Sequence, residues 1–111
     1  MERILNVVIE GNNYEVNVDE ELINSASELF YKMDMDMNNG WTLGKDFVEN
    51  PSVIQRCQIV GDKLLTALED DNSQMKQMMA GYILSRVPNI MTIYLDNSGH
   101  IQETQIELAT S

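Results

Sequence analysis

The sequence predicts an α+β domain, with a four-stranded antiparallel sheet and three helices packed on one of its faces. Apolar residues alternate with a period of two near both ends of the chain, and they recur every three or four residues in its middle. The expected order of elements is ββ-α-αα-ββ. An isolated hairpin is only marginally stable in water, so we expect the two terminal hairpins to join into one sheet that the helices cover. The chain, residues 1–111, fits a single globular domain.

The first hairpin is expected over residues 4–18. Apolar residues alternate over residues 5–9 and again over residues 14–18. Between them, residues 11–13 read Gly-Asn-Asn, and these residue types tolerate the positive φ that a tight turn requires. Alternation around such a turn is typical of an antiparallel pair of strands.

Three helices are expected between the hairpins. Asp19 is the expected cap of the first helix, whose apolar stripe ends near Met33. The second and third helices form an antiparallel pair around the acidic break at residues 69–72. The third helix ends at Pro88, because the residue before a proline avoids helical geometry. Residues 37–51 contain two glycines and a proline, and we expect a long loop there.

Two glycines within the paired helices suggest a close contact. Gly61 and Gly81 lie about ten residues on either side of the turn, so each would be about 15 Å from it along its helix. A glycine inside a helix costs about 1 kcal/mol relative to alanine. We therefore expect the two helices to cross closely at these residues. On the third helix, the stripe that contains Met75, Met78 and Met79 is expected to face the core.

The second hairpin is expected over residues 90–95 and 101–108. The turn between them is the Asp-Asn-Ser-Gly tetrapeptide at residues 96–99. Thr104 and Ile106 share a face of the returning strand that Ile101 does not share. We therefore expect a bulge or a late start of the strand at Ile101.

Composition excludes several classes of protein. The net charge of -11 argues against nucleic acid as a direct partner, because binding phosphate needs a basic face. No apolar run approaches the roughly 18 residues of a membrane span. The N-terminus lacks the basic and apolar segments of a signal peptide, and the lone Cys57 excludes an intrachain disulfide. We therefore expect a cytoplasmic protein.

The tract Met33-Asp34-Met35-Asp36-Met37, which leads to Trp41, is the most unusual part of the chain. It has no regular period, it ends in turn-forming residues, and it includes the only tryptophan. Methionines beside an aromatic ring make an adaptable surface for another protein. The predicted interaction surface is therefore a loop over residues 34–47 centred on Met35, Met37 and Trp41.

The same tract suggests a second kind of site. Asp34, Asp36 and Asn38 place oxygen ligands at alternate positions, as at the start of an EF-hand calcium loop. However, Gly40 is one position later than the glycine of that loop, and Lys45 stands where its bidentate glutamate should be. A divalent-metal-binding domain using the 34–40 loop is therefore an alternative. The favoured interpretation remains an interaction surface for another protein, and it assigns no residue as a metal ligand.

Nothing in the chain indicates catalysis. Cys57 lies on the apolar face of the second helix and is expected to be a buried thiol. A dyad of Cys57 with His100 would need a third, orienting group that the sequence does not indicate. The chain has no glycine-rich phosphate loop and no clustered metal ligands. We therefore expect no catalytic residue and no cofactor.

Several segments resemble a small bacterial family of uncharacterised proteins. They are the tract from Met33 to Trp41, residues 55–59 (Gln-Arg-Cys-Gln-Ile), residues 64–69 (Leu-Leu-Thr-Ala-Leu-Glu) and residues 82–84 (Tyr-Ile-Leu). The resemblance covers residues 33–95. It implies no activity, cofactor or partner.

Taken together, these features predict a small acidic cytosolic protein that is not an enzyme and acts in protein–protein interaction or regulation. The expected partner is another protein, and a second copy of the chain, in a homodimer, is one candidate. Neither nucleic acid nor a membrane is an expected partner. Besides metal binding, a further alternative is an acidic mimic of nucleic acid that binds a basic protein.

Overall fold

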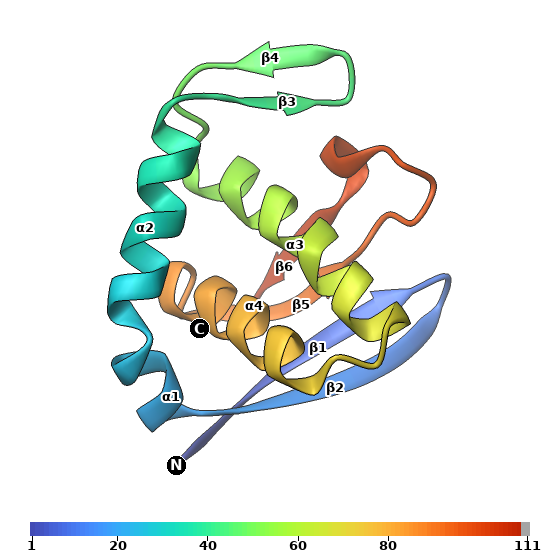
Figure 1. Ribbon diagram of the computed structural model, residues 1–111. Helices are drawn as coiled ribbons and strands as arrows, with labels where there is room; N and C mark the ends of the chain where they lie inside the picture. The colour runs from blue at the N-terminus through green and yellow to red at the C-terminus, as the bar shows by residue number, and fades with distance from the viewer. Residues whose placement is uncertain (110–111) are drawn as a thin grey trace.

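The α+β class is confirmed by a computed structural model, which describes residues 1–109 (Figure 1). In these residues it has a mixed four-stranded sheet, a separate two-stranded sheet and four α-helices. The elements are β1 (Glu2–Ile9), β2 (Asn12–Asp19), α1 (Glu20–Ser25), α2 (Ser27–Asn38), β3 (Trp41–Leu43), β4 (Asp46–Val48), α3 (Val53–Glu69), α4 (Ser73–Arg86), β5 (Ile90–Tyr94), the 3₁₀ helix η1 (Ile101–Glu103) and β6 (Gln105–Leu108).

The two terminal hairpins join into one sheet, but that sheet is mixed rather than purely antiparallel. Its strand order is β2-β1-β5-β6, and β1 runs parallel to β5. Val7 of β1 lies beside Ile93 of β5, and both side chains are fully buried. The prediction of an antiparallel sheet was wrong because the two most apolar strands pair at the centre, which leaves the more polar β2 and β6 at the edges.

The end of the sheet at β6 follows the sequence prediction. Residues 101–103 form η1, so the strand starts late, at Gln105. A register shift between Ile90 and Thr92 adds an irregularity to β5. The buried Thr104 hydroxyl accepts a hydrogen bond from the Asp96 amide, which closes the connection between the two strands.

The helices differ in number and extent from the prediction. The expected first helix is divided at Ala26 into α1 and α2, and α2 continues to Asn38 through the tract predicted as a loop. The rest of that loop, expected over residues 37–51, contains the β3–β4 hairpin. In Figure 1, α3 and α4 lie side by side over the sheet, and α2 crosses beyond their ends. No helix within residues 1–109 is long and apolar enough to cross a membrane.

The two helix glycines do not face each other. A Cβ atom on Gly61 would lie 2.9 Å from Leu95 Cδ2 and 3.3 Å from Ile93 Cδ1, so this glycine allows α3 to approach the sheet. A Cβ atom on Gly81 would lie 3.3 Å from Phe30 Cζ, on the side of α4 that meets α2. The predicted close packing exists at each glycine, but against different partners, because distance from the turn does not fix the direction in which a residue points.

Candidate functional site

A polar cluster fixes α2 across the ends of α3 and α4. The Asp34 carboxylate accepts hydrogen bonds from Arg86 Nε at 2.9 Å and Arg56 Nη1 at 3.2 Å. The Tyr82 hydroxyl donates to the same carboxylate, and the Tyr82 ring meets Phe30 of α2 edge to face at a centroid distance of 5.8 Å. One carboxylate therefore joins three helices beside an aromatic contact.

Arg56 extends this cluster to the chain that leads into α3. Its guanidinium also donates to the Asn38 and Asn50 side-chain oxygens and to the Pro51 carbonyl. These bonds join the end of α2 to the start of α3, the two helices that precede and follow the β3–β4 hairpin in the sequence. Arg56 therefore holds the end of α2 in place against the start of α3.

The cluster favours the ionised form of Asp34. Partial burial alone would raise the pKa of this carboxyl, but the hydrogen bonds from Tyr82, Arg86 and Arg56 outweigh burial, so the pKa lies below its ordinary value of 3.8. Burial, together with the adjacent Asp34 carboxylate, raises the pKa of the Tyr82 hydroxyl. Tyr82 is therefore a neutral hydrogen-bond donor at neutral pH.

The lowered pKa of Asp34 predicts an acid-sensitive contribution to stability. Since this pKa is lower in the folded than in the unfolded chain, the contribution is complete above the ordinary value of 3.8 and is lost as the pH falls below it. The difference in unfolding free energy between the native protein and Asp34→Asn should therefore shrink below that pH. Urea titrations over a pH series would measure it. A difference that stays constant across this range would contradict the assignment.

The arrangement leaves no EF-hand-like loop at Asp34, Asp36 and Asn38. All three residues lie in α2, where residues two apart point about 200° apart. The side-chain oxygens of Asp34 and Asn38 accept hydrogen bonds from Arg56. Across residues 1–109 no three His, Cys, Asp or Glu side chains are grouped to hold a metal ion. The side chains of Asp34 and Asn38 instead hold α2 in place.

The predicted interaction surface is divided in the structure. Met37 is 3% exposed and belongs to the core, so it offers no area to a partner. Met35 is 49% exposed, whereas Trp41 is half-buried at the start of β3. The helical geometry separates Met35 from Met37 because they are two residues apart in α2. Of the three residues, the structure therefore leaves Met35 and part of Trp41 accessible to a partner.

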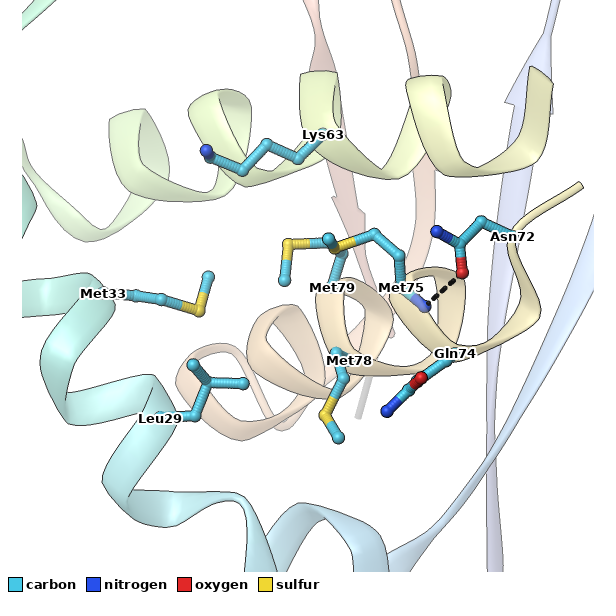
Figure 2. Close-up of a pocket in the computed structure, with 8 residues that line it drawn as sticks. All are labelled: Leu29, Met33, Lys63, Asn72, Gln74, Met75, Met78 and Met79. Atoms are coloured by element: carbon cyan, nitrogen blue, oxygen red, sulfur yellow. Dashed lines mark hydrogen bonds between the residues drawn. The ribbon is translucent and has the colours of Figure 1, made fainter. Parts of the chain in front are cut away.

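A different set of methionines forms a groove on the surface. We call it the methionine groove, and it has a volume of about 330 Å³. Figure 2 shows side chains from α2 and α4 reaching toward the same space beside Lys63 of α3. The groove is lined by Leu29, Met33, Lys63, Asn72, Gln74, Met75, Met78 and Met79. Leu29 and Met75 are 42% and 43% exposed, so apolar surface is open to solvent here.

Two smaller hollows flank the methionine groove. The first shares Met33 and Lys63 with it and adds Asp36 and Trp41. The second shares Lys63, Asn72 and Met75 and adds Asp62 and Asp70, among others. The Lys63 ammonium lies 5.4 Å from the centroid of the Trp41 ring. The groove is thus apolar at its centre, with carboxylates on both sides and one lysine held over an aromatic ring.

The methionines of this groove were identified in the sequence but were predicted to pack in the core. Met33 was predicted to complete the stripe of the first helix, and the structure places it half-buried at the groove. The stripe of Met75, Met78 and Met79 was predicted as core, but only Met79 is buried. The sequence does contain a signal for this groove: four methionines lie on two predicted helices, and methionines together can form an adaptable binding surface. The missing information was that α2 and α4 are neighbours.

The Cys57 thiol and the Ser98–His100 pair are poorly suited to catalysis. Cys57 is fully buried, and burial raises the pKa of its thiol to about 12. Ser98 Oγ lies 3.0 Å from His100 Nδ1, but the Asp96 carboxylate bonds to the Ser98 hydroxyl rather than to the imidazole. All of these contacts lie in an exposed turn, with no group placed to orient the imidazole as a base.

Comparison with known proteins identifies no matching family model, no similar curated protein and no similar solved structure. The resemblance to an uncharacterised bacterial family therefore gains no support from these comparisons. The residues of the site are therefore the basis for inferring a function.

Proposed function

We propose that the protein is a non-enzymatic binding domain that recognises another protein through the methionine groove. The observation that carries this proposal is an apolar groove of about 330 Å³ at the surface, lined by four methionines from two helices. Methionine side chains are flexible and polarisable, so they adapt to the shape of a bound apolar group. A pocket of this size is large enough for one or two large apolar side chains.

The scaffold supports this role. The Asp34 cluster and the contact between Phe30 and Tyr82 fix α2, which forms one wall of the groove, against α4, which forms another. The backbone of the groove is thus held in place while its side chains can change rotamer. The inert thiol of Cys57 is compatible with the reducing cytoplasm, where we propose that the protein acts.

The test compares two double variants that remove similar apolar area from different surfaces. In Leu29→Gln/Met75→Gln the groove is changed, whereas in Tyr31→Gln/Met35→Gln only the exposed side of α2 is changed. Tagged versions would be expressed in the native cells, and the proteins bound to each would be identified. We expect one bound protein to be lost from the groove variant and retained by the other.

Circular dichroism would establish that both variants stay folded. Light scattering of the purified protein would show whether the partner is a second copy of the chain. Loss of binding only in Tyr31→Gln/Met35→Gln would move the interface to the surface around Met35 and overturn the proposal. Retention of the same partners by both variants would overturn it too.

A further inference from the structure

Carboxylates lie beside the methionine groove at both of its ends, one on α2 and two on α3 and its C-cap. Asp36 lines the hollow beside Trp41 and Val60, and Asp62 and Asp70 line the hollow at the other end of the groove. Val60 and Asp70 are ten positions apart, which corresponds to about 15 Å along a helix. The lining of the three hollows thus has three carboxylates and one ammonium, and that ammonium lies against the Trp41 ring.

The acidic end of the groove is unfavourable for the helix that carries it. The C-terminus of a helix has a partial negative charge, which disfavours carboxylates and favours bases. The last turn of α3 has no basic residue, and Asp70 is its C-cap. Asp70 is exposed and lines the hollow beside the groove. It also lies two residues before Asn72, the N-cap of α4, and the positive end of that helix offsets part of the cost.

The walls of the groove indicate the conformation of an occupant. They are side chains of α2, α3 and α4, and no strand edge lines the groove. An extended peptide placed there would have no strand edge to pair with, so those of its amides and carbonyls that face the groove would lose water without gaining partners. The lining offers side-chain amides only at Asn72 and Gln74, and the Asn72 oxygen already accepts a hydrogen bond from the Met75 amide. A helix satisfies its own backbone.

We propose that the methionine groove binds a short amphipathic helix of a partner protein, with apolar side chains at its centre and basic side chains toward both ends. This inference rests on the proposed function and adds the chemistry of the partner. The apolar residues enter among Met33, Met75 and Met79, and the basic residues meet Asp36 at one end and Asp62 and Asp70 at the other. The charge of -11 would also speed the approach of a basic segment.

The test uses three synthetic peptides of leucine and a charged residue. The first is an amphipathic helix of leucine and lysine, the second has glutamate in place of lysine, and the third has the composition of the first in a scrambled order. The protein carries ¹³C in its methionine methyl groups, so NMR reports on Met33, Met75, Met78 and Met79 directly. We expect the first peptide to shift these signals and to bind more tightly than either control.

A matched pair of variants tests the carboxylates. Asp62→Asn/Asp70→Asn removes two charges from the hollow that adjoins the groove, and Glu2→Gln/Glu15→Gln removes two exposed charges on the sheet. We expect the groove variant to weaken binding of the lysine peptide by about three- to tenfold and the sheet variant to weaken it by less than about twofold. Asp62→Asn/Asp70→Asn should melt no lower than the native protein, so weaker binding would not reflect unfolding.

The outcomes separate this inference from the proposed function. Equal binding of the glutamate or scrambled peptide, or no effect of Asp62→Asn/Asp70→Asn, would overturn the basic helix and leave the groove as an apolar binding site. If no peptide shifts the methyl signals of the groove, the inference fails, and the proposed function is then decided by the comparison of Leu29→Gln/Met75→Gln with Tyr31→Gln/Met35→Gln. If only signals of methionines outside the groove shift, the peptide binds elsewhere and the inference fails.

Discussion

Asp34→Ala is expected to lower the free energy of unfolding by roughly 2–3 kcal/mol. The substitution removes the carboxylate that Arg86 binds through Nε and Nη2, at 2.9 and 2.7 Å. It also leaves the hydroxyl of the fully buried Tyr82 without its acceptor. Arg56 loses less, because it keeps acceptors at Asn38, Asn50 and Pro51. The Asp34 side chain is 23% exposed, so water offsets part of the loss.

The matched control is Asp36→Ala, which removes the same side chain two residues further along α2. Asp36 is exposed, and its carboxylate forms none of the ion pairs found within residues 1–109. We expect a change within about 0.5 kcal/mol. Urea unfolding followed by Trp41 fluorescence would measure both variants. Equal effects of the two substitutions would contradict a special role for Asp34 in fixing α2.

Local patterns predicted the hairpins and the paired helices well. The alternation over residues 5–9 and 14–18 depends only on neighbouring residues, and β1 and β2 form where it occurs. The turn of residues 69–72 likewise separates α3 from α4. The parallel pairing of β1 with β5 could not be predicted in this way, because it joins residues more than eighty positions apart and depends on the path of every helix between them.

The tract around Asp34 misled sequence reasoning for a physical reason. Its alternation of methionine and aspartate suggests no helical stripe, yet successive residues of a helix point 100° apart and can each meet a different environment. Met33 and Met37 meet apolar neighbours, whereas Asp34 meets two arginines that lie 22 and 52 residues further along the chain. The residues that contact the tract are therefore distant in the sequence and could not be inferred from the tract alone. The only local sign of a helix was the four-residue spacing of Met33 and Met37, which places them on one helix face.

The methionine groove could not be predicted from local sequence patterns either. Each of its walls could be recognised as an apolar stripe on a helix, and a stripe is ordinarily buried. Whether Met75 is buried or open depends on how α2 is placed against α4, and Phe30 and Asp34 of α2 both contact Tyr82 of α4. The groove therefore exists only in the packed structure and has no signature within either helix alone.

Gly61→Leu is expected to destabilise the protein by about 3 kcal/mol or to prevent folding. A single Cβ atom at this position would already lie 2.9 Å from Leu95 Cδ2, and the three further carbons of leucine would have to enter between α3 and β5. The gain of about 1 kcal/mol in helix propensity is too small to offset that overlap. Thermal unfolding followed by circular dichroism would measure the loss.

The adjacent Asp62→Leu is the control, because it adds a leucine to the same helix at an exposed position, and it should shift the unfolding free energy by no more than about 0.5 kcal/mol. A second variant identifies the surface that Gly61 contacts. If the glycine faces the sheet, Leu95→Ala should remove part of the overlap, so that Gly61→Ala costs less in that background than in the native one. If the cost of Gly61→Ala is the same in both backgrounds, α3 does not approach β5 at this residue.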